Sequence, residues 1–287
     1  ATAFALGFLG EVSLANYDQV RWVGPFSAAF VLLGCIPTFI WLRERGKAQT
    51  LPAGESVVRL GFRRLGETWH ELRQFQDLSR LLVSIFFSMA GIAIIVSFAF
   101  IYGAQVIHWD DSVRSLMFVI VQINAAIGAI AFGILQSRIG SRFTYLMSQG
   151  LWVFAILAIW LTPELTELAH AQLGVAWEAQ YVFLFAGCLA GLSLGSAQSA
   201  GRALVGLLTP TAKAAEFFGF WGMAAKLAAV FGMLGLGLLQ TFFGLADAIL
   251  FCLVLFAMAM IMVWPVDEQR GIRAAEAWQD PTQKEHA

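Results

Sequence analysis

The chain has 287 residues, of which 59% are hydrophobic and 13% are charged, and its formal net charge is -1 at pH 7. Soluble domains carry about 25% charged residues, so this composition excludes an ordinary soluble domain. It predicts an all-α, polytopic membrane helix bundle, and we expect the lipid bilayer rather than nucleic acid as its partner.

The apolar segments follow in chain order. A helix needs about 20 apolar residues to cross the hydrocarbon core of a membrane. Six such segments contain no Asp, Glu, Lys or Arg, namely residues 22–42, 81–109, 115–137, 143–163, 179–201 and 248–266. A seventh, residues 217–239, contains Lys226 as its single charged residue. The apolar residues 1–14 are expected to form the outer part of an eighth span, in a chain cut within a membrane helix.

The lysines and arginines predict how these spans are oriented. Residues 43–80 contain eight of the 18, and alternation of the spans places seven more on the same side of the membrane. Only Arg21 and Arg114 fall on the opposite side, and Lys226 lies within the membrane. Cytoplasmic loops carry an excess of Lys and Arg. We therefore expect the 43–80 loop and the C-terminal tail in the cytoplasm.

One long loop divides the chain into parts. The expected parts are two helices in residues 1–42 (the first truncated), a cytoplasmic linker in 43–80, a six-helix bundle in 81–266 and a cytoplasmic tail in 267–287. A six-helix bundle after a central loop is typical of the back half of a twelve-helix transporter. The front half of the same transporter is therefore an expected partner.

Two further patterns concern apolar side chains near the membrane surface. Within the linker, residues near helical spacing favour an amphipathic helix on the inner membrane face over a solvated linker. They are Leu65, Trp69, Leu72, Phe75 and Leu78. Tryptophans near the span ends predict an aromatic belt that anchors the protein. They are Trp22, Trp109, Trp160, Trp177 and Trp264.

A motif lies between the third and fourth full spans and reads Gly133-Ile-Leu-Gln-Ser137-Arg138-Ile-Gly140-Ser-Arg142. It resembles the inner-loop signature of the major facilitator superfamily, although Ser137 stands where that signature has Asp and Phe143 where it has a second basic residue. Glycine permits a tight turn, and arginines are favoured at an anionic membrane surface. The alternative is an ordinary basic turn. The departure at Ser137 removes the carboxylate of the usual loop-to-helix charge relay.

A closer resemblance lies in residues 194–202 (Leu-Gly-Ser-Ala-Gln-Ser-Ala-Gly-Arg) and 215–221 (Ala-Glu-Phe-Phe-Gly-Phe-Trp), with Lys226 beyond them. Together with residues 3–10, they resemble the vacuolar amino-acid effluxer family of that superfamily, from its fifth helix to its twelfth. The chain departs from the family at Met233, where a proline is expected. The resemblance implies a secondary transporter that exports amino acids or a similar small solute by alternating access. Since the family has many bacterial relatives, it also implies a bacterial inner membrane as the location.

Lys226 is the strongest single candidate for a functional residue. It lies ten residues after Glu216, about 15 Å deeper along a helix. A cation at membrane depth costs a few kcal/mol or more and is usually paired. A structural ion pair and a role in substrate or proton coupling both remain open. Glu216 suits the start of a helix, where the helix dipole favours an anion, as a plain first-turn acid or as a functional one.

Other polar residues interrupt the apolar spans. Gln198 and Arg202 are four residues apart and could face a cavity together. Gln122 and Asn124 cannot both face lipid without cost, so at least one should line a pathway or bond a neighbour. We expect substrate binding or coupling by Lys226, Arg202, Gln198, Gln122 and Asn124, and gating by Gly133, Arg138, Gly140, Arg142 and Glu216. Gly191 and Gly195 share a helix face with Ser199 and are expected to permit close helix packing.

Several chemistries are not expected. The cysteines Cys35, Cys188 and Cys252 each lie in an apolar run and predict no disulfide framework. No histidine spacing is typical of a metal site. The chain has no Walker loop, zincin helix or nucleophile elbow, so we expect neither an enzyme nor a cofactor. The alternative function is a non-transporting membrane assembly factor or scaffold of the same fold.

Overall fold

The computed structural model describes residues 23–42, 61, 63, 66, 72–173 and 177–278. All regular structure in these ranges is helical, as the sequence predicts. The predicted span in residues 1–14, Leu65 and Trp69 of the amphipathic segment, and the tail after residue 278 lie outside the described residues. The chain divides into two units, Ala1–Leu60 and Gly61–Ala287. In the first unit the described helix is α3 (Val23–Trp41), which coincides with the first full span predicted.

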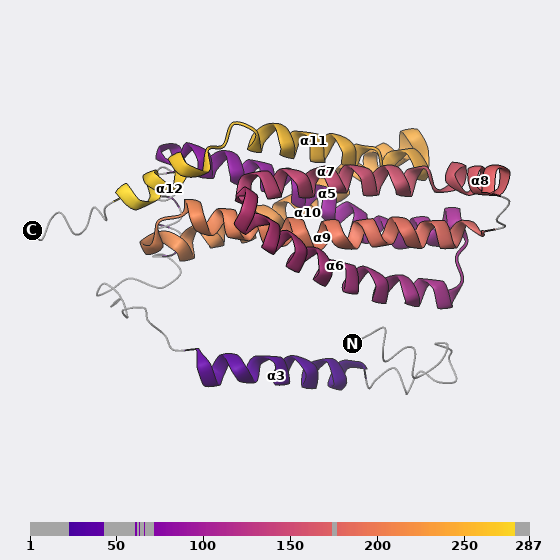
Figure 1. The fold of residues 1–287 in the computed structure, drawn as a ribbon, viewed down its shortest axis with the longest axis horizontal. Coiled ribbons are helices and arrows are strands. Elements are labelled where there is room, and N and C mark those ends of the chain that lie inside the picture. Colours follow the sequence, from indigo (N-terminus) through magenta and orange to yellow (C-terminus); the bar gives the residue numbers. More distant parts are fainter. Residues whose placement is uncertain are drawn as a thin grey trace, which may run out of the picture. The chain divides into compact units, whose positions relative to one another are not determined.

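The second unit is a helix bundle (Figure 1). Its long helices are α5 (Gln76–Tyr102), α6 (Asp111–Ile139), α7 (Ser141–Trp160), α9 (Ala179–Leu208), α10 (Ala214–Ala248) and α11 (Phe251–Val263). Short pieces are η1 (Leu72–Gln74), the π-helix η2 (Gly103–Ile107), α8 (Thr162–Leu173), η3 (Thr211–Lys213) and α12 (Glu268–Ala277). Helices α8 and α12 lie at opposite ends of the bundle, which we call the α8 end and the α12 end (Figure 1).

The spans predicted from the sequence are recovered as helices. Six described helices are long and apolar enough to cross a membrane, and α11 with α12 makes a seventh if that bent pair is one span. The start of the span predicted in residues 248–266 needs correction, because the break in the helical backbone lies at Gly244, before residue 248. The chain reverses at Gly244, whose φ of 81° suits glycine, and the backbone is helical again before Phe251. Ile249 and Leu250 form a turn with right-handed helical dihedral angles between α10 and α11, and the Cys252 amide donates to the Ile249 carbonyl oxygen at 2.9 Å.

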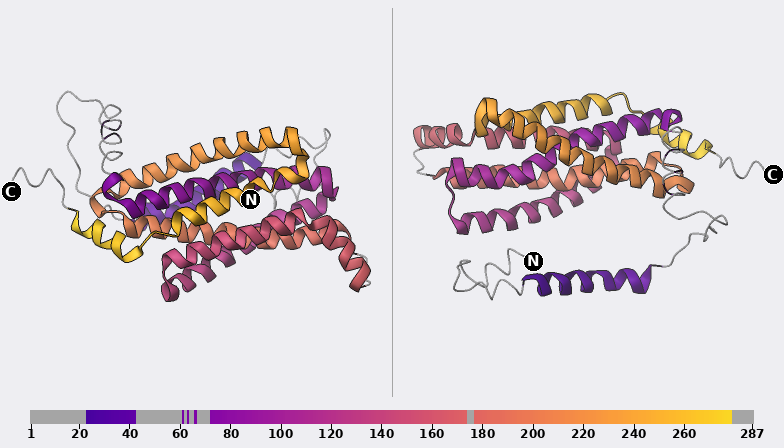
Figure 2. Two further views of the ribbon diagram at one scale, coloured as in Figure 1. Left: turned by 90° about the horizontal axis from the view of Figure 1, so that it is seen from above. Right: turned by 180° about the vertical axis from the view of Figure 1, so that it is seen from behind.

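The long helices of the second unit run roughly alongside one another (Figure 2). Helix α6 packs along α9, α7 along α9, and both α10 and α11 along α5. Large aromatic side chains fill the interior, and Trp152 of α7 stacks on Phe256 of α11 with ring centroids 5.4 Å apart. In lipid, which is as apolar as the rings themselves, such contacts stabilise the bundle through close van der Waals packing.

Two of the helices leave most of their apolar surface uncovered. Only 6% of the most apolar window of α6 and 17% of that of α10 are buried, against 61% for α5. Large apolar side chains such as Ile130 on α6 and Leu234 on α10 are about two-thirds exposed. An apolar helix that its own bundle does not cover faces lipid or another protein segment.

The predicted amphipathic segment is wrong at its C-terminal end. Phe75 and Leu78 are buried in the bundle, and Phe75 meets Phe217 of α10 edge-on at 5.7 Å. Helix α5 begins at Gln76, five residues before the start of the uncharged span predicted in residues 81–109. The charge of Asp77 is tolerated inside this first turn because Arg270 pairs with it. The side chains therefore pack in the core instead of lying on a membrane surface.

Candidate functional site

A crossing of α6 and α9 through small residues forms one wall of the candidate site. Gly187, Gly191 and Gly195 lie four residues apart on α9 and face α6. A Cβ atom on Gly191 would lie 2.6 Å from the Val121 carbonyl oxygen, and one on Gly195 only 1.8 Å from that of Ala125. The two backbones therefore approach as closely as glycine alone allows. This confirms that Gly191 and Gly195 serve helix packing.

Beside this crossing, a cavity of about 280 Å³ lies among α5, α6, α7 and α9. Aromatic rings form much of its wall, and Phe100 and Phe118 stack at 4.3 Å. Gln122 contributes an amide to this lining, which contains no charged residue. A mostly apolar lining with few polar groups is typical of small-molecule sites.

Of the two polar residues predicted in this part of α6, only Gln122 lines the cavity. The Asn124 amide donates to the Ile120 carbonyl oxygen of its own helix at 2.9 Å. Its Cβ atom would lie 2.9 Å from a Cβ atom built on Gly191. The Asn124 side chain therefore donates a hydrogen bond within its own helix at the helix crossing. Gln122 thus lines a cavity, and the expectation that one of the two lines a solute pathway stays a prediction.

Gln198 and Arg202 come together as their spacing predicts, but they do not line this cavity. The Arg202 Nη2 atom donates to Gln198 Oε1 at 3.2 Å. The Arg202 guanidinium also lies over the ring of Trp221 on α10, 5.1 Å from its centroid. This cation–π contact links α9 to α10. The pair therefore joins two helices while the Arg202 side chain remains exposed.

Lys226 is exposed on the surface of α10. Within the described part of the chain it forms no hydrogen bond and no ion pair within 4 Å. The structure thus supplies no partner for the predicted structural ion pair. Glu216, in the first turn of α10, lies 3.9 Å from Lys213 Nζ, which fits the interpretation as a first-turn acid.

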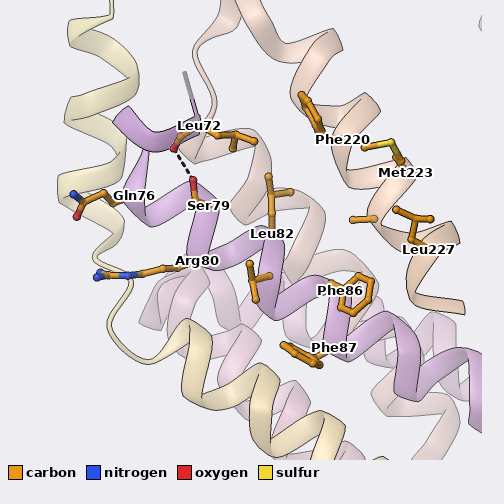
Figure 3. Close-up of a pocket in the computed structure, with 12 residues that line it drawn as sticks. Leu72, Gln76, Ser79, Arg80, Leu82, Phe86, Phe87, Phe220, Met223 and Leu227 are labelled. Carbon is orange, nitrogen blue, oxygen red and sulfur yellow. Dashed lines mark hydrogen bonds between the residues drawn. The ribbon is translucent and has the colours of Figure 1, made fainter. Parts of the chain in front are cut away.

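A larger groove of about 710 Å³ lies between α5 and α10 (Figure 3). Its lining includes Leu227, the residue that follows Lys226 in the chain. Phe86 of α5 faces the apolar side chains of Met223 and Leu227 on α10 (Figure 3). Gln76 and Arg80 project from another side of α5 (Figure 3). The groove is thus an apolar surface with polar side chains near the α12 end.

The signature motif forms the turn between α6 and α7. Gly140 has a φ of 87°, so the predicted tight turn at this glycine is confirmed. The carboxylate of Glu268, from α12, accepts hydrogen bonds from the amides of Ser141 at 3.0 Å and Arg142 at 3.2 Å. An anion at a helix N-terminus is favoured by the unpaired amides and the helix dipole. Glu268 thus brings a carboxylate to a motif that has Ser137 in place of Asp.

The other signature residues differ in their contacts. The Arg142 guanidinium donates to the Trp264 carbonyl oxygen and lies 6.0 Å from the ring centroid of that residue. The Ser137 hydroxyl donates to the Ile134 carbonyl oxygen of its own helix at 2.7 Å. Arg138 is exposed, and a Cβ atom on Gly133 would meet no atom within 4 Å. Arg142 and Gly140 therefore define the turn, and Gly133 makes no close packing contact.

Sequence reasoning missed the ion pair that fixes α12 to the bundle. Arg270 donates to both oxygens of Asp77, from Nε at 2.7 Å and from Nη2 at 2.5 Å. Asp77 Oδ1 also accepts from the amide of Asp267 at 3.0 Å, and Asp267 in turn caps α12. A bidentate Arg–carboxylate pair is strong and geometrically specific. The pair could not be found from the sequence, because Asp77 and Arg270 are 193 residues apart. The one available signal was Asp267, an aspartate at the N-cap position, which predicts the start of a helix.

The comparisons with known proteins agree with these observations. Residues 3–276 match the family model described as "Vacuole effluxer Atg22 like". The "Uncharacterized MFS-type transporter YxiO" of Bacillus subtilis is 25% identical over 272 residues, covering 94% of this chain and 58% of that protein. "Autophagy-related protein 22" of Botryotinia fuckeliana is 22% identical over 283 residues, covering 93% of this chain and 46% of that protein.

The Saccharomyces cerevisiae protein of the same name is 23% identical over 223 residues, covering 77% of this chain and 42% of its own length. No solved structure matches. The chain spans about half the length of the curated relatives it matches. Its apolar helices and the match to a bacterial MFS-type transporter identify an integral membrane protein of the major facilitator type.

Proposed function

Because this chain belongs to the Atg22-like vacuole effluxer family, we propose that it is part of a secondary transporter for amino acids or a similar small solute. The observation that carries the proposal is the cavity among α5, α6, α7 and α9, with the Gln122 amide in an aromatic lining. Its volume of about 280 Å³ is near the lower end of ligand pockets, which suits a small solute. The names of the relatives do not favour a non-transporting scaffold.

The composition of the cavity wall suggests how a solute would be held. Apolar and aromatic side chains would contact the apolar part of the solute, and Gln122 would donate or accept a hydrogen bond. A charged carboxylate would need a cation from elsewhere, because the described lining has none. Lys226 is our candidate, since it lies within a long apolar helix with no described partner. Arg202 and Gln198 are placed second, because they already bond each other.

We also propose that the α12 end faces the cytoplasm. Arg138, Arg142 and Arg270 lie at that end, whereas Asp110 and Asp111 lie at the other, which fits the positive-inside rule. Cysteines replacing Asp111 and Arg273 separate the two orientations, since both side chains are exposed. In intact cells, an impermeant maleimide should label Asp111→Cys at once and Arg273→Cys only after permeabilisation. The reverse pattern would contradict this orientation.

Transport by the full-length protein in proteoliposomes tests the proposed function. We expect saturable uptake of at least one amino acid, driven by an ion gradient and independent of ATP. Ala99 lines the cavity, so Ala99→Leu should fill part of it and reduce transport about tenfold or more. Ser97→Leu is the matched control, because Ser97 is exposed on the same helix and does not line the cavity.

Two results would reject this assignment. The first is the absence of uptake for every amino acid by folded wild-type protein under both directions of the gradient. The second is equal transport by Ala99→Leu and Ser97→Leu, which would place the solute path elsewhere. Both variants should give wild-type yields in size-exclusion chromatography, since Ala99 is only partly buried.

A further inference from the structure

The end of α5 has an unusual backbone. The helix does not stop at Tyr102 but continues as the π-helix η2 (Gly103–Ile107), which His108 ends with a φ of 54°. His108 is the one non-glycine residue with positive φ among those described. Such conformations cost about 1–3 kcal/mol and persist only where the surroundings enforce them. Single π-turns are also frequent at functional sites.

Trp109 follows this turn and folds back onto it. Its amide donates to the Gly103 carbonyl oxygen at 3.1 Å. A Cβ atom on Gly103 would lie 2.6 Å from the indole ring, so the ring occupies the space that glycine leaves. The side chain is only 8% exposed, and its Nε1 atom has no hydrogen-bond partner within the described structure. Trp109 is therefore not the exposed membrane anchor that its position near a span end predicts.

The indole packs behind the cavity wall at the α8 end. Its ring lies 5.7 Å from that of Phe100 and 5.5 Å from that of Phe183. Both rings line the cavity, and they are the lining residues nearest to the α8 end on α5 and α9 respectively. Trp109 thus does not line the cavity itself but packs against the two aromatic rings at the α8 end of its wall.

The neighbouring residue ties this turn to α9. The Asp110 amide donates to Gln180 Oε1 at 3.0 Å, and Gln180 Nε2 donates to Asp110 Oδ2 at 3.0 Å. Two features of the same turn are unfavourable and act against these hydrogen bonds. The His108 backbone is strained, and the buried indole N–H lacks a hydrogen bond among the described residues, which costs about 1–3 kcal/mol. Closure therefore depends on ring packing and on two hydrogen bonds, and both can be removed by substitution.

We propose that Trp109 is the gate of the cavity at the α8 end, and that a solute passes only when the turn after α5 releases the indole. The proposal rests on the proposed function in so far as this cavity carries the solute. It assigns to Gln180 the role of a positioning residue, which holds the closed turn through Asp110.

Cysteine labelling of the full-length protein tests this gate. Ala190 lines the cavity and is 9% exposed, so Ala190→Cys reports entry of reagent after Cys35, Cys188 and Cys252 are changed to serine. A charged, impermeant methanethiosulfonate is added from the side that the α8 end faces. Trp109→Ala and Gln180→Ala should each raise the labelling rate severalfold, while Trp109→Phe should stay close to wild type. Trp177→Ala is the control, because Trp177 is exposed near the same end.

The outcomes separate the gate from the proposed function. Equal labelling rates for wild type, Trp109→Ala and Gln180→Ala in folded protein would overturn the gate, even if amino-acid transport is observed. Raised rates in both variants would support the gate, even if no amino acid is transported and the proposed function fails. If Trp109→Ala does not fold, Gln180→Ala decides, since it keeps the indole and removes the hydrogen bonds that Gln180 makes to Asp110 and Glu178.

Discussion

Replacement of Gly195 by leucine is expected to abolish the folded protein. The added Cβ atom would lie 1.8 Å from the Ala125 carbonyl oxygen and 2.6 Å from its carbonyl carbon. These are backbone atoms of α6, so no side-chain rotation can relieve the clash, and α6 must move away from α9. Overpacking costs about 1–3 kcal/mol, occasionally more, in proteins whose total stability is about 5–15 kcal/mol. Separation of the helices would also disturb contacts at Gly187 and Gly191.

The measurement is the yield of monodisperse full-length protein and its thermal midpoint in detergent. Gly237→Leu is the matched control, since Gly237 lies within α10 and a Cβ atom there would meet nothing within 4 Å. We expect the control to keep the wild-type yield and Gly195→Leu to lose it. Equal midpoints for the two variants would show that the α6–α9 crossing is not as close as described.

Lys226→Met is expected to abolish transport by the full-length protein while its yield stays near wild type. Methionine keeps an apolar stem of similar length, so contacts along α10 are largely retained. Lys226 has no anionic partner among the described residues, so its removal should leave no buried charge unpaired in this part of the chain. Loss of transport would then reflect a role with the solute or a proton. Lys226→Arg should rescue poorly, because a planar guanidinium does not replace a compact ammonium.

Measurement of both transport and thermal stability distinguishes the interpretations of Lys226. A less stable Lys226→Met protein that still transports would indicate a structural ion pair with a group outside the described residues. Normal transport and normal stability would leave Lys226 as a tolerated exposed cation. Arg114→Met serves as the control for loss of a cation, because Arg114 lies at the α8 end and, among the described residues, forms an ion pair with Asp111 three residues before it.

The sequence by itself determined the long apolar helices among the described residues, but not the short helices α8 and α12. Each span needs a length that the thickness of the bilayer sets and an almost complete absence of charge, and both are local properties. The spans in residues 115–137 and 179–201, for example, lie inside α6 and α9. The turn at Gly140 and the close packing at Gly191 and Gly195 were also predicted, because they depend on glycine itself.

The tertiary structure decided which side chains meet. The pairing of Asp77 with Arg270 and the carboxylate of Glu268 at the start of α7 join segments that are far apart in the chain and that no local pattern relates. Hydropathy cannot choose between helix neighbours, because lipid tails are as apolar as the helix surfaces that compete with them. Neighbours are chosen by shape, small residues and a few polar contacts. For that reason Trp109 and Phe75, which read as surface residues in the sequence, are buried in the bundle.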